Sequence, residues 1–298
     1  MFIINHKKIF LTISAVIVAA SIFFIAYFGL NFGIDFKGGA LTEVTYTTRP
    51  TIEQVKASVT TAGFPEAHIQ PVGEDSYLIK TTDLDAVAHT KLLGALSVKD
   101  SGMTEKNFTS IGPSVGKELK TKSIVSILAV ALAIVLFIAY AFRKVSEPVS
   151  SWKYGLIAIV TLIHDIVIPS GVFALLGHFY GAEVDTLFVV AILTVLGLSV
   201  SDTIVVFDRI RENLRAHRTE SFGETVGKSL SQTFTRSINT SLTVILVLLA
   251  LFFFGPATTK YFSLMLVVGM FFGTYSSIFV ASPILVLVEG WQRNKKNR

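Results

Sequence analysis

Six apolar runs, each long enough to cross a lipid bilayer, recur along the chain. They cover residues 9–30, 123–142, 154–176, 186–207, about 235–254 and 261–288. An α-helix rises about 1.5 Å per residue, so about 20 apolar residues span the hydrocarbon core of a bilayer. The pattern predicts an α-helical polytopic membrane protein with six transmembrane helices.

The first run follows a basic triplet at residues 6–8, and a cleaved signal peptide is the alternative interpretation. The run is longer than a typical signal-peptide core, and no A-x-A cleavage site followed by a polar start closes it. We therefore expect residues 1–30 to form the N-terminus and an uncleaved first transmembrane helix.

Between the first two runs lies a polar stretch, residues 31–122, with the patterning of a small α+β domain. Thr51-Ile-Glu-Gln54 has the spacing of a helix capping box. The predicted elements are a strand at 38–48, a helix from 51 to near 63, strands at 68–72 and 77–81, a helix at 83–96 and a strand at 107–111. This β-α-β-β-α-β order predicts a ferredoxin-like domain between helices 1 and 2.

Basic residues are concentrated on one side of the predicted spans. If the N-terminus is cytoplasmic, the inside segments carry fifteen Lys and Arg residues, whereas the two short outside loops carry only Lys260. The fifteen are Lys7, Lys8, Arg143, Lys144, Lys153, Arg209, Arg211, Arg215, Arg218, Lys228, Arg236, Arg293, Lys295, Lys296 and Arg298. The positive-inside rule then predicts that both termini are cytoplasmic and that residues 31–122 are extracytoplasmic. Helices 2–6 occupy residues 123–288, and residues 289–298 form a basic cytoplasmic tail.

The composition agrees with this topology. Hydrophobic residues make up 51% of the 298 residues and charged residues only 16%, against about 25% charged in a soluble protein. The net charge of +5 follows from the inside segments, so we expect the lipid bilayer, and no nucleic acid, as a partner. The chain has no cysteine, which excludes disulfides and thiolate metal sites.

Residues 208–234 form a charged cytoplasmic loop between spans 4 and 5. Ser221-Phe-Gly-Glu224 has the pattern of a capping box that opens a helix, and we expect a helix lying on the cytoplasmic surface. The oppositely charged pairs at a spacing of three residues are Asp208/Arg211 and Glu212/Arg215.

Asp202 lies inside the apolar part of span 4, about one turn before the charged exit. A carboxylate in hydrocarbon is costly and is typical of proton or ion pathways. Arg236 lies at a comparable depth in span 5, so the two residues are a candidate pair. Burial and a nearby guanidinium act on a carboxylate in opposite directions, and their balance lets it bind and release a proton. Arg236 could instead extend to the inner membrane surface.

Span 3 carries His164-Asp165, and Asp165 lies about 17 Å from the start of the span, near the middle of the bilayer. Two adjacent titratable groups at this depth indicate a second polar station. In the alternative interpretation they only satisfy polar atoms of a neighbouring helix.

Two further patterns mark spans 5 and 6. Arg236, Asn239, Thr240 and Thr243 share one face of the span 5 helix, and such a stripe turns toward protein or water rather than lipid. Small residues at four-residue intervals in span 6 predict close helix packing. They are Gly269, Gly273, Ser277 and Ala281.

The sequence lacks the motifs of common energy-using or hydrolytic sites. Residues 223–229 resemble a phosphate-binding loop, but three residues separate the glycines where the motif has four, and no strand precedes them. There is no H-E-x-x-H motif, no G-x-S-x-G motif and no His/Cys ligand cluster. We predict no cofactor, no metal site and no enzymatic activity, so the energy for any work comes from an ion gradient or a partner.

Several segments resemble, in order along the chain, signatures of SecF-type members of the SecD/SecF protein-export family. The first is Gly33-Ile-Asp35-Phe-Lys-Gly38-Gly39, which follows the first span. The others are Gly112-Pro-Ser-Val-Gly116, His164-Asp165, the segment from Ser201 to Asn213 and the segment from Gly273 to Ala281. Lys37 and Ser201 depart from the family pattern, where a small hydroxyl residue and asparagine are usual.

The resemblance implies a subunit of an RND-type pair in the bacterial inner membrane. It implies a SecD-like partner, a SecYEG-like channel, an unfolded preprotein as substrate, and a proton or sodium gradient as the energy source. It also implies that Asp202 is the intramembrane acid and Arg236 its basic partner. The alternatives are half of an RND-type lipid or drug exporter, which usually has a far larger outer domain, and a structural scaffold whose buried charges serve only assembly.

Overall fold

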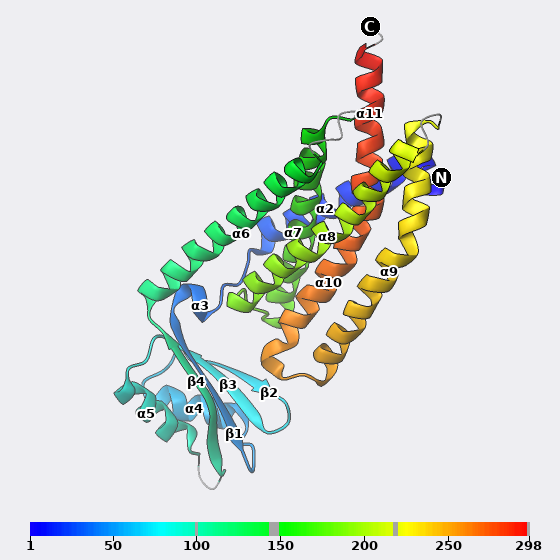
Figure 1. Ribbon diagram of the computed structural model, residues 1–298. Coiled ribbons are helices and arrows are strands. Elements are labelled where there is room, and N and C mark those ends of the chain that lie inside the picture. Colours follow the sequence, from blue (N-terminus) through cyan, green and yellow to red (C-terminus); the bar gives the residue numbers. More distant parts are fainter. Residues whose placement is uncertain (99–100, 143–148, 217–219, 297–298) are drawn as a thin grey trace. The chain divides into compact units, whose positions relative to one another are not determined.

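The computed structural model describes residues 1–298 except 99–100, 143–148, 217–219 and 297–298. The predicted inside charges Arg143, Lys144, Arg218 and Arg298 therefore lie outside the described residues. The chain divides into two compact units. Met1–Asn31 and Val125–Arg298 form a helical unit, and Phe32–Ile124 form a smaller unit with a β-sheet (Figure 1).

Six helices of the described chain are long and apolar enough to cross a membrane, which confirms the six predicted spans. The helices of this unit are α1 (Phe2–Asn5), α2 (Lys7–Phe28), α6 (Pro113–Ala141), α7 (Ser151–Tyr180), α8 (Thr186–Ala216), α9 (Phe222–Phe254), α10 (Lys260–Ser276) and α11 (Ser282–Lys296). Their lengths follow from the apolar runs, extended at the ends by polar turns. The first part of α6, residues 113–124, belongs to the smaller unit. In α7, α8 and the α10–α11 span, half or more of the apolar window is buried, whereas α2, α6 and α9 are largely uncovered.

The expected surface helix between spans 4 and 5 is not a separate element. Helix α8 continues to Ala216 and α9 begins at Phe222, so residues 208–216 and 222–234 prolong the two spans. The predicted capping box is present at the start of α9, where Ser221 and Glu224 bond each other's backbone N–H groups. Arg211 pairs with Asp208 as predicted, but the ion pair of Glu212 is with Arg209, at 2.6 Å, rather than with Arg215.

Span 6 contains a break that the sequence analysis did not anticipate. A π-helical turn, Ser277–Ala281, separates α10 from α11. At this turn Ser282 Oγ donates to the carbonyl oxygen of Ser277, five residues earlier, at 3.3 Å. Single π-turns inside long helices often mark functional positions.

The smaller unit contains a four-stranded antiparallel sheet with the order β2-β3-β1-β4. Its elements are α3 (Ile34–Lys37), β1 (Gly39–Tyr46), α4 (Ile52–Thr61), β2 (His68–Val72), β3 (Ser76–Thr81), α5 (Ala86–Leu96) and β4 (Met103–Ile111). The capping box of α4 is confirmed at Thr51 and Gln54. Strand β4 begins earlier than predicted because its pairing with β1 continues past a bulge at Glu43/Val44. Tertiary pairing there overrides the low strand propensity of Glu105, Lys106 and Asn107.

The core of this unit lies between the sheet and its two longer helices. Alternate residues of β1, among them Val44 and Tyr46, point to one face and are buried. Val55 of α4 and Leu92 of α5 belong to the same apolar cluster. The Tyr46 hydroxyl donates to the Leu96 carbonyl oxygen at 3.0 Å and ties the sheet to the end of α5.

Candidate functional site

Asp165 lies at the centre of a buried polar cluster built by three spans. Its carboxylate accepts hydrogen bonds from Ser199 Oγ of α8 at 2.5 Å and from Ser276 Oγ of α10 at 2.9 Å. The Nδ1 atom of the preceding residue, His164, lies 2.9 Å from the carboxylate. Only 1% of Asp165 is exposed. A buried charge tolerates this position only when such partners satisfy it.

His164 is held between Asp165 and two aromatic rings. Its ring stacks on Tyr275, with centroids 6.1 Å apart and an interplanar angle of 11°, and meets the edge of Phe272. The other ring nitrogen, Nε2, is buried and has no hydrogen-bond partner among the described residues. A buried polar atom without a partner is uncommon in folded proteins and calls for an explanation.

Asp202 forms a second acidic station, between α8 and α9. Its Oδ1 atom accepts a 2.5 Å hydrogen bond from Ser237 Oγ. Its Oδ2 atom is buried and, within the described part of the chain, has no partner. The carboxylate therefore has one oxygen anchored and one available.

The structure separates Asp202 from direct contact with Arg236. Among the described residues the two form no ion pair; the serine that binds Asp202 is the next residue along α9. Arg236 is exposed, although it remains close enough for an electrostatic interaction with Asp202. Successive residues of a helix point about 100° apart, which explains why Ser237 faces α8 and Arg236 does not.

A buried series of hydroxyl residues on α9 escaped the sequence analysis. Ser241, for example, bonds Thr274 of α10, just as Ser237 bonds Asp202. The spacing of four residues was the signal that could have revealed the series. Its members, all buried, are Thr225, Ser229, Thr233, Ser237 and Ser241.

The polar stripe predicted from the sequence lies on another face of α9. Arg236, Asn239, Thr240 and Thr243 are all exposed in the single chain. The buried hydroxyl series packs against the other helices of the chain. The polar stripe is therefore not covered by the described part of this chain.

Small residues of the α10 span lie directly against α8, next to the Asp165 cluster. A Cβ atom at Gly269 would come within 2.2 Å of Val195, and one at Gly273 within 2.9 Å of Ser199 Cβ. One turn further, Ser277 Oγ lies 2.8 Å from Thr203 Oγ1. A side chain at Gly273 would displace Ser199, which donates to Asp165. Ala281, in the same series, is fully buried.

The glycine signature after the first span builds a tight junction within the smaller unit. Gly33 is the N-cap of α3, and Asp35 lies in its first turn. Gly38 has φ +81° and Gly39 φ +137°, values that favour glycine. A Cβ atom at Gly38 would lie 2.8 Å from Pro113 Cα. The two sequence signatures around Gly38 and Pro113 are therefore packed against each other.

The six candidate membrane helices and the buried Asp165 and His164 between them identify the class of protein. It is a polytopic membrane protein with buried titratable side chains between its spans. Among the described residues no group of three or more His, Asp or Glu side chains is arranged to hold a metal ion.

Comparison with known proteins identifies the family within that class. The family model "Protein export membrane protein SecD/SecF, C-terminal" matches residues 94–291, and the "SecD/SecF GG Motif" model matches residues 23–48. The "Protein translocase subunit SecF" of Thermobaculum terrenum is 43% identical over 95% of this chain and 92% of its own length. The corresponding subunit of Anaerolinea thermophila is 37% identical over 96% and 94%, respectively.

A solved structure agrees with these sequence relatives. The crystal structure of SecDF, a translocon-associated membrane protein from Thermus thermophilus, matches 99% of this chain with a TM-score of 0.82 and 32% identity. This chain spans 38% of the length of that SecDF chain. The chain belongs to the SecD/SecF family of protein-export membrane proteins.

Proposed function

We propose that this chain is an auxiliary subunit of a bacterial protein translocase, which promotes the passage of proteins across the cytoplasmic membrane by using an ion gradient. The SecF relatives support the transport role, because this chain covers more than nine-tenths of their length at up to 43% identity. The single observation that carries the coupling role is Asp202, whose Oδ2 atom is buried and without a partner in the described chain.

The membrane arrangement completes this proposal. The smaller unit is a ferredoxin-like domain that lies outside the membrane between α2 and α6; its strand order β2-β3-β1-β4 supports this assignment. Both termini are cytoplasmic. The packing supports a common side for the two termini, because the N-terminal residues and α11 both contact the start of α9. Gly227 lies against Met1, and Gly223 lies near Ile4 and Val286.

Asp202 can take up a proton without losing its anchor. Ser237 holds Oδ1, so a proton arriving at Oδ2 neutralises the carboxylate in place. Protonation removes most of the free-energy cost of placing the Asp202 charge in hydrocarbon. The contact between α8 and α9 can then rearrange. Arg236 keeps its charge throughout and acts as an electrostatic gate. Sodium binding to the same carboxylate is the equivalent step in a sodium-driven system.

The Asp165–His164 cluster is the other proton-binding position of this pathway. Ser199 and Asp202 are three residues apart on α8, about 4.5 Å along the helix axis. The hydroxyl groups of Thr203 in α8 and Ser277, the first residue of the π-turn after α10, lie 2.8 Å apart close to both carboxyl-bearing positions. Hydroxyl groups both donate and accept, so they can relay a proton between the two carboxylates.

A second, SecD-like half covers the exposed polar stripe of α9 in this proposal. Arg236, Asn239 and Thr240 would otherwise face lipid, which a polar stripe in a spanning helix avoids. The SecDF relative supports such a neighbour, because this chain matches only part of that longer chain. The pair acts on a SecYEG-like channel and on unfolded preproteins.

The test replaces Asp202 by Asn, which keeps the shape and the hydrogen bond from Ser237 but does not titrate. Asp202→Glu keeps a titratable carboxylate, and Asp208→Asn removes a carboxylate outside the apolar part of α8. We expect gradient-stimulated preprotein translocation into membrane vesicles to be lost in Asp202→Asn, to remain in part in Asp202→Glu, and to be unchanged in Asp208→Asn. A scaffold role predicts full activity for Asp202→Asn, and that result would refute the coupling proposal.

The partner assignment has its own test. A cysteine at Thr240 should cross-link to a cysteine series placed along the spans of the SecD-like protein in native membranes. Leu198 of α8, also exposed and at a depth comparable to that of Thr240, provides the matched control position on another helix. Equal cross-linking from both positions, or none from Thr240→Cys, would contradict the assignment of the α9 stripe.

A further inference from the structure

A pocket lies at the end of α8, outside the two acidic stations. Its volume is about 380 Å³, and its lining residues all come from α8. They are Asp208, Arg211, Glu212, Arg215 and Ala216. The proposed transport mechanism uses none of them.

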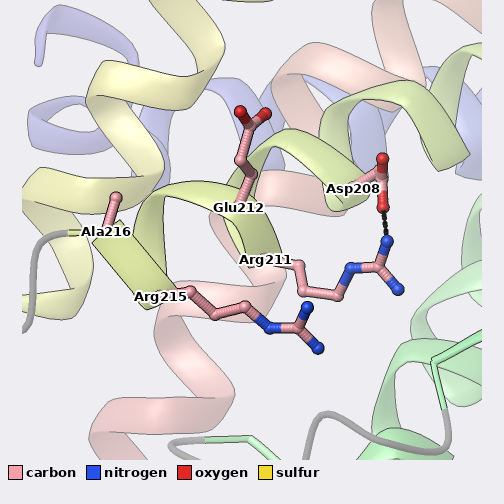
Figure 2. Close-up of a pocket in the computed structure, with 5 residues that line it drawn as sticks. All are labelled: Asp208, Arg211, Glu212, Arg215 and Ala216. Atoms are coloured by element: carbon pink, nitrogen blue, oxygen red, sulfur yellow. Dashed lines mark hydrogen bonds and ion pairs between the residues drawn. The ribbon is translucent and has the colours of Figure 1, made fainter.

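Two guanidinium groups, those of Arg211 and Arg215, provide the positive charge of this pocket. Arg211 and Arg215 are one helical turn apart and extend to the same side of α8, whereas the Glu212 carboxylate points away (Figure 2). Glu212 is bound by Arg209 instead. Arg211 uses one nitrogen for Asp208, and Arg215 makes no ion pair within the described ranges. The lining thus carries two arginines and two carboxylates, but both carboxylates are bound, Asp208 by Arg211 and Glu212 by Arg209. Among the described residues, Arg215 and the remaining nitrogens of Arg211 leave several N–H donors free to bind an anion.

The surroundings of the pocket place it at the level of lipid headgroups. The Arg211 guanidinium lies 5.7 Å from the ring centroid of Phe142. That ring stacks on Tyr154, which begins the apolar part of α7, with centroids 5.3 Å apart. Trp152, two residues earlier, is 61% exposed, with the Lys153 ammonium over its ring. Exposed tryptophan and basic residues at the end of a span are typical of the membrane–water interface.

We propose that Arg211 and Arg215 bind the phosphate group of an anionic phospholipid at the cytoplasmic end of α8. Two guanidinium forks at one-turn spacing match the oxygens of a phosphate, which arginine binds in a bidentate manner. Free phosphate offers the same oxygens, but the interfacial position of the pocket favours a lipid as the source. Basic pockets at the cytoplasmic ends of spanning helices are suited to such headgroups.

The test measures binding of phosphatidylglycerol to the full-length purified chain by native mass spectrometry. Phosphatidylcholine is the neutral reference lipid. We expect the double variant Arg211→Gln/Arg215→Gln to bind phosphatidylglycerol roughly tenfold or more weakly, because each basic group near the membrane surface contributes to headgroup affinity. The charge-matched comparison uses single variants: Arg215→Gln should weaken binding about fivefold, whereas Lys228→Gln, which removes one positive charge from α9 outside the pocket, should change affinity less than about twofold.

Each other outcome overturns the proposal. If Lys228→Gln weakens binding as much as Arg215→Gln, general surface charge holds the lipid. If phosphatidylcholine binds equally well, or the double variant binds normally, the pocket does not recognise anionic lipid. If inorganic phosphate binds at the pocket and displaces phosphatidylglycerol, free phosphate is the ligand. Thermal unfolding verifies folding; should the double variant fail to fold, Arg215→Gln alone must weaken binding and Arg215→Lys must restore part of it.

Discussion

Gly38→Ala is expected to destabilise the smaller unit strongly, although it adds only one methyl group. Gly38 has φ +81° and ψ 158°, a region that residues with a side chain rarely adopt. The added Cβ atom would lie 2.8 Å from Pro113 Cα and 2.9 Å from Pro113 N. Both neighbours are backbone atoms at the start of α6, so neither can move aside like a flexible side chain.

The expected loss is about 3 kcal/mol in the free energy of unfolding of this unit. Backbone strain of this kind costs about 1–3 kcal/mol, and overpacking adds about 1–3 kcal/mol. The two costs are not fully additive, because one local backbone shift relieves part of both. A domain of this size is stable by about 5–14 kcal/mol, so the change removes a large part of its stability. Gly94→Ala is the matched control: nothing lies within 4 Å of its Cβ position in α5, and it should stabilise by about 0.5–1 kcal/mol.

The assay is pulse proteolysis of the full chain in membranes across a urea series, with cleavage followed within residues 32–124. We expect a lower urea midpoint for Gly38→Ala and an unchanged or higher midpoint for Gly94→Ala. A midpoint for Gly38→Ala equal to that of the unaltered protein would refute the packing argument for the glycine signature.

Three further predictions follow from single contacts. Burial raises the pKa of Tyr46 to about 12, so its neutral form stabilises the fold fully below pH ~10, and this contribution is lost as pH rises through about 12. Tyr46→Phe should flatten that alkaline loss in a pH series of unfolding midpoints; an unchanged slope would contradict it. Gly269→Ala should destabilise by about 1–3 kcal/mol, and Val195→Ala in the same chain should restore thermal stability in part; additive losses would disprove the contact. Ser199→Ala removes a donor from buried Asp165 and should cost about 1–3 kcal/mol by thermal unfolding, whereas no change would exclude that bond.

Local patterns predicted the six spans and most elements of the smaller unit, but not the π-turn at Ser277–Ala281 or the continuation of α8 and α9 beyond their apolar runs. Apolar runs identified all six spans because a bilayer imposes a minimum length on them. The capping boxes at Thr51 and Ser221 identified two helix starts, since their side-chain and backbone partners lie within one turn. The missed start of β4 depends on pairing with β1, which residues near Met103 do not reveal by themselves.

The geometry of the candidate site depended on tertiary contacts. Asp165, His164 and Asp202 stood out because titratable residues in apolar runs are rare. Their partners did not: Ser199, Ser276 and Ser237 are small polar residues common in spanning helices, and only the helix packing brings them to the carboxylates. The suggested pairing of Asp202 with Arg236 ignored helix rotation, which turns neighbouring residues to different faces.

The ion-coupling role of Asp202 can be measured most directly as ion uptake. Proteoliposomes would hold the chain together with its SecD-like partner, a trapped ion-sensitive dye and an imposed proton or sodium gradient. The account predicts uptake of one of the two ions by the unaltered protein and by Asp208→Asn, and background uptake by Asp202→Asn. Uptake by Asp202→Asn equal to that of the unaltered protein would contradict it.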